Sequence, residues 1–271
     1  MNLADYPAIE LSEVQVRVGG HSILHAEEFI VPNGKIVAVI GPNGAGKSTL
    51  LRVCAGVQPL NRGIVRIAGQ SPRHPQSRRR LAYVPQALAV AGELPITVRE
   101  VVTIGRTGLR GLFHRLRTED HLKVENWIGR LGLSDVADYP YAETSGGQQR
   151  KTLLARAMVQ EPAILLLDEP TVNLDAGARE IVVQALEQLH EGLHLTILLA
   201  CHDLETIPAS CDRVIILNDG RIVADGLPTL ELTRRRVSAL YGGDLSVIRK
   251  AGRHALVPAS IAEPAGDAYG V

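Results

Sequence analysis

A glycine-rich segment that ends in a lysine and two hydroxyl residues is the first feature of this chain that could do chemistry. The segment consists of Gly41, Pro42, Asn43, Gly44, Ala45, Gly46, Lys47, Ser48 and Thr49. It matches GxxxxGK followed by Ser or Thr, and it lies between an apolar run at 35–40, predicted as a strand, and a predicted helix. Such glycines let backbone N–H groups converge on phosphate oxygens, and the helix N-terminus adds positive charge. We therefore expect a nucleotide site in which Lys47 reaches the β- and γ-phosphates, Ser48 binds Mg²⁺ and Thr49 contacts phosphate.

A pair of carboxylates follows a second apolar run. Asp168 and Glu169 come directly after residues 163–167, which are predicted as a buried strand. Ligands in open α/β sheets bind at the carboxyl ends of the strands. We expect Asp168 to hold Mg²⁺, usually through water. Glu169 should point to the other face of the strand, where it can polarise an attacking water.

A third segment combines a small hydroxyl residue with two glycines at the start of a predicted helix over 149–160. Its residues are Ser145, Gly146, Gly147 and Gln148. This is a second anion cradle, because a helix N-terminus presents free N–H groups. One chain cannot easily bring both cradles to the same phosphate. The simplest solution is a head-to-tail dimer of two copies that encloses two ATP molecules.

The order of apolar patterns predicts the elements that position these residues. The first third alternates between apolar and polar residues, as half-buried strands do, and tight turns separate the strands. The middle has helical periodicity, with Thr97 and Thr118 predicted as N-caps. Afterwards continuous apolar strands alternate with helices, which indicates a parallel sheet covered on both faces. We predict an α/β nucleotide-binding core with a helical insertion at about 87–161.

Composition excludes several classes of protein. The chain has 271 residues, 45% of them apolar and 21% charged, and its 29 basic and 29 acidic residues balance. A neutral chain with only 3% aromatic residues is not typical of nucleic-acid binding. The three cysteines, Cys54, Cys201 and Cys211, have no CxxC spacing, which argues against a disulfide scaffold. No apolar run is long enough to span a membrane and no secretory signal is visible, so we expect a cytoplasmic protein.

The three segments, with Gln86, Asp175 and His202, stand in an order that resembles the ATP-binding subunits of ABC transporters. The resemblance covers about residues 8–235. It implies a P-loop NTPase core with an antiparallel β subdomain and an inserted α-helical subdomain, with ATP and Mg²⁺ as cofactors. The expected organisation is an ATP-binding domain over 1–242 and a C-terminal extension over 243–271, whose end is typical of a disordered terminus.

The resemblance also implies roles for single residues. Gln86, after Val84 and Pro85, would sense Mg²⁺ and the γ-phosphate and link to the transmembrane subunit. Asp175 would communicate across the dimer, and His202 would contact the γ-phosphate. The implied catalytic residues are thus Glu169, His202, Gln86 and Lys47, and the implied Mg²⁺ ligands are Ser48, Gln86 and Asp168.

The chain departs from the family pattern at three places. Val18 stands where an aromatic residue usually stacks on adenine, so His21 or Tyr6 would have to supply that contact. Thr144 replaces the usual leucine before the second cradle. Arg150–Lys151 stand where the family usually has Gln-Arg. None of these changes removes a catalytic residue, so we expect an active ATPase.

The helical insertion and the last strands resemble one subgroup. Residues 94–102, 105–106, 111–116, 119–120, 211–218 and 221–224 look like the zinc, manganese and iron importer group. This predicts import of a transition-metal ion through a separate permease, with an extracellular substrate-binding protein and a location on the inner face of the cell membrane. Alternatives are an importer of iron-siderophores, haem or cobalamin, an exporter, a module that binds ATP without hydrolysis, and a non-transport ABC protein. The single phosphate loop and the lack of heptads argue against the last.

Overall fold

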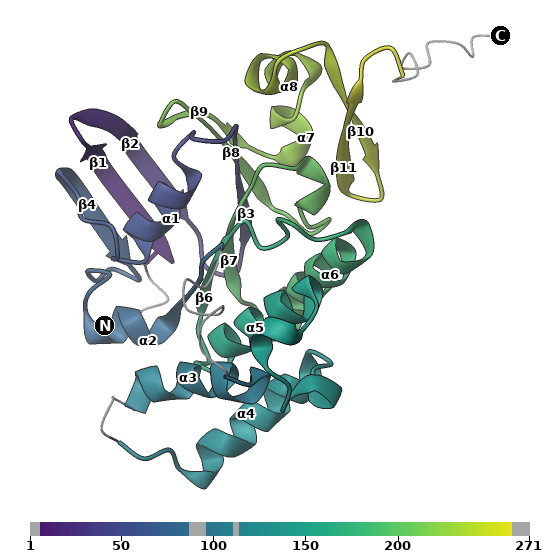
Figure 1. The fold of residues 1–271 in the computed structure, drawn as a ribbon. Coiled ribbons are helices and arrows are strands. Elements are labelled where there is room, and N and C mark those ends of the chain that lie inside the picture. The colour runs from purple at the N-terminus through teal and green to yellow at the C-terminus, as the bar shows by residue number, and fades with distance from the viewer. Residues whose placement is uncertain (1–5, 87–95, 111–113, 262–271) are drawn as a thin grey trace.

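The computed structural model describes residues 6–86, 96–110 and 114–261 of the chain. Nine strands form one mixed sheet (Figure 1). In spatial order they are β4 (Arg62–Ile67), β1 (Ile9–Val18), β2 (His21–Val31), β9 (Arg221–Gly226), β8 (Arg213–Asn218), β3 (Ile36–Ile40), β7 (Thr196–Cys201), β6 (Ile164–Asp168) and β5 (Leu81–Val84). The strands from β8 to β5 pair in parallel, whereas β1 pairs antiparallel with β2 and β4. The predicted α/β core with an antiparallel β part is confirmed.

The central strands β3, β6 and β7 are buried at every position, because helices cover both faces of the sheet. Neighbouring residues of β3, such as Ala38 and Val39, belong to two different apolar clusters. The helix α1 (Lys47–Cys54) packs into the cluster of Val39, and α6 (Ala176–Leu193) packs into that of Ala38. Since β3, β5, β6 and β7 are parallel, their carboxyl ends meet at one edge of the sheet.

Three helices lie between β5 and β6 in the chain and pack on one another, at the centre and bottom of the view in Figure 1. They are α3 (Val98–Arg110), α4 (Thr118–Arg130) and α5 (Gly146–Met158). All three lie in the middle stretch where helical periodicity is predicted, and α5 overlaps the helix predicted at 149–160. The beginning of the predicted insertion, at 87–95, and residues 111–113 of the importer-like pattern lie outside the described residues.

One of the two predicted N-caps is wrong. Thr97 Oγ1 accepts the backbone N–H of Glu100 at 3.2 Å, as an N-cap does. Thr118, however, is already the first residue of α4, and the cap position belongs to Arg117. The reason is the carboxylate of Asp120, which accepts the backbone N–H of Arg117 at 3.0 Å and so extends the polar start of the helix by one residue.

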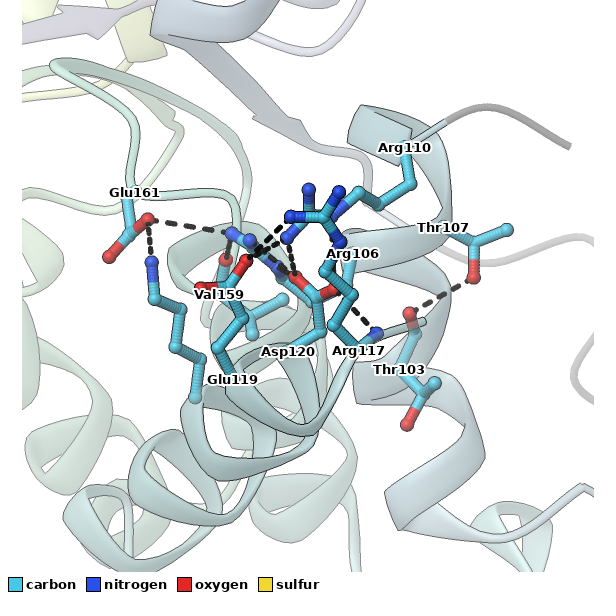
Figure 2. Close-up of polar contacts among 10 residues, drawn as sticks. Thr103, Arg106, Thr107, Arg110, Arg117, Glu119, Asp120, Val159 and Glu161 are labelled. Atoms are coloured by element: carbon cyan, nitrogen blue, oxygen red, sulfur yellow. Dashed lines mark hydrogen bonds and ion pairs between the residues drawn. The ribbon is translucent and has the colours of Figure 1, made fainter. Parts of the chain in front are cut away.

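A buried ion cluster fastens the three helices together (Figure 2). Arg106 of α3 donates two hydrogen bonds to Asp120 of α4, at 2.6 and 2.8 Å, and a third to the carbonyl of Val159 after α5, at 3.0 Å. Asp120 has no exposed surface. Burial alone would raise the pKa of Asp120, but bonds from the Arg117 backbone, Arg106 and Arg110 outweigh it and hold the pKa well below its usual value.

The chain after β9 contains structure that sequence patterns did not predict. Its elements are α7 (Pro228–Glu231), α8 (Arg234–Tyr241), β10 (Leu245–Lys250) and β11 (Arg253–Pro258). A further short helix, α2 (Pro75–Arg80), lies earlier in the chain, before β5. β10 and β11 form an antiparallel hairpin, at the top of the view in Figure 1. Of the residues in these two strands only His254 is buried, so apolar periodicity is weak there. The predicted disorder at the end of the extension falls on 262–271, outside the described residues.

Two further observations concern helices. Only the 3-10 turn Leu204–Thr206 forms before Pro208, because the fixed φ and missing N–H of proline disfavour a longer helix. Within the described ranges, no helix combines the length and the apolar character that crossing a membrane requires.

Candidate nucleotide site

The glycine-rich segment connects β3 to α1 at the carboxyl edge of the sheet. A Cβ atom on Gly41 would lie 2.1 Å from the carbonyl oxygen of Leu217, so no side chain fits there. Gly46 combines a φ of 100° with similar crowding. Lys47 is 4% exposed, and its ammonium group donates to the carbonyls of Gly41 and Pro42, at 2.8 and 3.0 Å. The segment therefore has the tight backbone and the inward lysine of a phosphate cradle.

Ser48 and Asp168 meet directly. Ser48 Oγ donates to Asp168 Oδ1 at 2.7 Å, and Asp168 is fully buried at the end of β6. A hydroxyl and a carboxylate side by side are ligands that suit Mg²⁺. Both residues were predicted as ligands, and the structure brings them together.

Tyr83 is a member of this group that sequence reasoning missed. Its hydroxyl donates to Asp168 Oδ2 at 3.1 Å from the neighbouring strand β5. Burial and, to a smaller extent, the charge of Asp168 raise the pKa of Tyr83 to about 12. No strand was predicted at 81–84, because a run of only four residues is too short for its apolar pattern to be recognised. Tyr83 was missed for that reason.

Glu169 is the centre of a second group. Its Oε2 accepts the side-chain amide of Gln86 at 3.0 Å, and the nearest ring nitrogen of His202 lies 3.8 Å from the same oxygen. The ammonium of Lys47 lies 3.7 Å from Oε1. Three predicted catalytic residues from three other segments therefore converge on the carboxylate of the fourth. Burial lowers the pKa of Lys47, and the charge of Glu169 acts in the opposite direction.

The backbone at Glu169 supports a special role. Its φ is 48°, in the left-handed region that residues other than glycine rarely adopt. Such strain is often stored at functional sites, where the surrounding structure holds it. Here its backbone N–H is fixed by the carbonyl of Ala200 at 3.0 Å. The two adjacent acids have different partners, since Asp168 accepts from Ser48 and Tyr83 while Glu169 lies among Gln86, Lys47 and His202.

The second cradle forms the start of α5. Ser145 Oγ accepts the N–H of Gln148 at 3.3 Å, and the Gln148 side chain accepts the N–H of Ser145 at 2.9 Å, a reciprocal capping box. Cβ atoms on Gly146 and Gly147 would lie 3.1 and 3.2 Å from the loop before α6 and its first turn. Asp175, in that loop, caps α6 by accepting the N–H of Ala178 at 2.8 Å.

The two cradles are separate within one chain. Among the described residues, the polar contacts of Ser145, Gln148 and Asp175 are all local, and none joins them to Lys47 or Ser48. A second copy as the source of these residues stays a prediction.

Two of the positions at which the chain departs from the family pattern, Val18 and Thr144, have defined surroundings in the structure. Val18 is 57% exposed and pairs with His21 at the tip of the β1–β2 hairpin. Tyr6 instead packs its ring against Gly69, so His21 is the candidate beside Val18 for contacting adenine. The hydroxyl of Thr144 is buried and donates to the carbonyl of Tyr141 at 2.7 Å.

Comparison with known proteins identifies the family. The model of the ABC transporter family matches residues 24–172. The zinc transport system ATP-binding protein TroB of Treponema pallidum is 37% identical over 239 residues, which are 88% of each chain. The manganese transport system ATP-binding protein MntA of Synechocystis is 35% identical over 87% of this chain and 93% of that protein.

A solved structure agrees. The chain of an ABC transporter described as metal-chelate type and inward-facing superposes with a TM-score of 0.79 and 25% identity, covering 93% of this chain and 97% of that one. The predicted resemblance is confirmed. This chain belongs to the ABC transporter family, as an ATP-hydrolysing subunit.

Proposed function

We propose that this chain hydrolyses ATP to energise the import of a transition-metal ion (zinc, manganese or iron) through a separate permease. The observation that carries the catalytic part is the convergence of Lys47, Gln86 and His202 on the carboxylate of Glu169. The support for the cargo is similarity to relatives named for zinc and manganese transport, which extends over most of the chain.

The glycine-rich loop and the start of α1 are the proposed phosphate-binding segment. In this proposal the backbone of 41–46 and the ammonium of Lys47 hold the phosphates, and Thr49 adds a hydroxyl. Ser48, Asp168 and Gln86 hold Mg²⁺, because oxygen ligands suit that ion. When bound, Mg²⁺ neutralises charge that develops on the phosphate oxygens.

Glu169 is the proposed base. Its carboxylate is held on three sides by Gln86, Lys47 and His202, so it keeps one orientation toward an attacking water and can accept a proton from it. His202 is 45% exposed in its side chain and is free to reach the γ-phosphate from its loop after β7.

The proposal includes a head-to-tail dimer. Ser145, Gly146, Gly147, Gln148 and Asp175 of a second copy would complete each nucleotide site. The support is that this cradle is fully formed, at the N-terminus of a helix of 13 residues, yet serves no phosphate group of its own chain. Binding of ATP would then favour the closed dimer by differential affinity.

A groove provides a candidate permease contact. A cavity of about 290 Å³ lies between α2, α3 and the end of α5, and it is lined by Arg78, Arg79, Arg156, Ile104 and Leu109 among others. A cytoplasmic segment of the permease could dock there. Attachment through the permease would make this chain cytoplasmic and peripheral on the inner face of the membrane, in one system with an extracellular substrate-binding protein.

A Glu169→Gln variant tests the catalytic part. Turnover should fall at least about a hundredfold, because general-base assistance is lost, while ATP binding and ATP-dependent dimerisation persist. The measurements are phosphate release, equilibrium binding of ATP, and size by light scattering. Turnover near that of the wild type would refute the assignment of the base.

The cargo needs its own experiment. Cells that lack the chain would be complemented with wild type or with Glu169→Gln, and uptake of radiolabelled zinc, manganese and iron would be followed. Only the wild type should restore uptake of one of these ions. Restoration of haem, cobalamin or iron-siderophore uptake instead would favour the alternative importers, and accumulation in the deficient cells would indicate an exporter.

A further inference from the structure

Arg150 occupies a position where the family usually has glutamine, in the second turn of α5. Its guanidinium group donates to the backbone carbonyl of Gln86, which follows β5 and is 64 residues away in sequence. The contact links the helix that begins at Ser145 to a residue at the carboxyl edge of the sheet. It is a contact to the main chain, so it constrains where the Gln86 residue as a whole lies.

The other end of Gln86 meets the proposed base. Its side-chain amide donates to Glu169 Oε2 at 3.0 Å. Among the described residues these are the hydrogen bonds that Gln86 makes: its carbonyl accepts from Arg150 and its amide donates to Glu169. Gln86 is exposed. These two hydrogen bonds therefore tie its main chain to Arg150 and its side chain to Glu169.

The environment of Arg150 fits this contact. The side chain is partly buried, and burial lowers its pKa, while the nearby Tyr141 hydroxyl and the Glu169 carboxylate act in the opposite direction. A guanidinium stays protonated in proteins, so Arg150 presents a permanent cation on the Glu169 side of α5.

The same helix is held differently at its other end. There Arg106 donates to the carbonyl of Val159 from within the buried Asp120 cluster (Figure 2). That end is fastened to α3 and α4, whereas Arg150 reaches out of the helical layer to the catalytic edge. A displacement of α5 would therefore also displace Gln86, through the contact of Arg150 with its carbonyl.

We propose that Arg150 is a positioning residue for ATP hydrolysis, which holds Gln86 by its carbonyl so that the Gln86 amide meets Glu169. The inference rests on the proposed roles of Gln86 and Glu169. It gives α5 a direct link to the proposed base within one chain, in addition to any role of the same helix toward a second copy.

The first test compares two substitutions on the same helix. Arg150→Gln restores the usual family residue and should lower kcat roughly tenfold with little change in KM for ATP, because positioning and not binding is lost. Lys151→Gln removes an equal charge from the next residue, which does not contact Gln86, and should keep the wild-type kcat. Thermal unfolding of both variants checks that they are folded. An unchanged kcat in Arg150→Gln would overturn the inference, as would an equal loss in Lys151→Gln.

A double-mutant cycle separates positioning from a general structural role. Gln86→Ala removes the amide but keeps the carbonyl that Arg150 binds. If Arg150 acts through that amide, adding Arg150→Gln to Gln86→Ala should lower kcat no further. Independent, multiplying losses would overturn the proposal. Arg150→Lys keeps a cationic donor and should recover part of kcat; it also carries the cycle if Arg150→Gln does not fold.

The Glu169→Gln variant distinguishes the two levels of the proposal. If it turns over normally, the assignment of the base fails whatever Arg150 does. If it is inactive while Arg150→Gln has full kcat, the base assignment stands and only the role of Arg150 is overturned.

Discussion

Two clusters in this chain each surround a carboxylate but differ in how tightly that carboxylate is paired. Asp120 is fully buried and accepts direct hydrogen bonds from Arg106 and Arg110 at 2.6 to 2.9 Å. Glu169 keeps some exposure, with one hydrogen bond from Gln86 at 3.0 Å, the Lys47 ammonium at 3.7 Å and a ring nitrogen of His202 at 3.8 Å. The first carboxylate has no capacity left for a ligand, whereas the second can still accept a proton.

The elements that supply the clusters differ as well. The Asp120 cluster joins two consecutive helices and the end of a third, so it fixes their packing. The residues of the Glu169 cluster come from the loops that follow β5, β6 and β7 and from the first turn of α1. This edge of the sheet is where we expect a nucleotide phosphate and a water to bind. The closely paired, buried charges thus fix the packing of the helices. The loosely paired groups at the edge of the parallel sheet leave a carboxylate that can take part in a reaction.

The largest effect on stability should come from breaking the tight cluster. Asp120→Asn leaves two arginines without their shared carboxylate, and we expect the free energy of unfolding to fall by about 3–5 kcal/mol. Chemical denaturation would measure it. Turnover per folded molecule should change little, in contrast to Glu169→Gln.

A matched control lies in the same helical layer. Asp138 also pairs with an arginine, Arg99, but its side chain is 76% exposed. Asp138→Asn should therefore cost less than about 1 kcal/mol. Equal losses in the Asp120 and Asp138 variants would contradict the view that burial makes the first cluster the structural one.

The pH dependence of stability should sharpen the comparison further. The pKa of Asp120 is depressed in the folded state, so its contribution is fully present above its ordinary value near 3.8 and is lost as the pH falls toward the folded pKa. The difference in unfolding free energy between wild type and Asp120→Asn should therefore be constant from pH 7 to about pH 5 and shrink in more acidic buffers. A difference that grows on acidification would have the wrong sign.

A smaller effect is expected at the Mg²⁺ ligands. Tyr83→Phe removes a hydrogen bond that orients the carboxylate of Asp168. The Mg²⁺ concentration for half-maximal turnover should rise about tenfold, with kcat at saturating Mg²⁺ preserved. Tyr139→Phe, at an exposed tyrosine of the helical layer, serves as the control. An unchanged Mg²⁺ requirement in Tyr83→Phe would mean that Asp168 is held by Ser48 alone.

Local patterns in the sequence were sufficient for much of this molecule. The glycine-rich loop, the apolar strands β3, β6 and β7 and the helix start at Ser145 each depend on a few consecutive residues, so they could be predicted. Prediction was weaker where local signals compete or are short. Asp120 places the N-cap of α4 at Arg117 and not at Thr118, the four-residue strand β5 was missed together with Tyr83, and the polar hairpin β10–β11 left little periodicity to detect.

Short runs of adjacent residues were thus enough to predict the family, and with it the order of the phosphate loop, the two acids and the second cradle. Which charges meet depends on tertiary packing. Arg106 finds Asp120 across two helices, Arg150 reaches Gln86 over 64 residues, and four segments meet at Glu169. Burial and pairing distance separate a structural ion pair from a reactive one, and both arise from packing between segments that lie far apart in the chain.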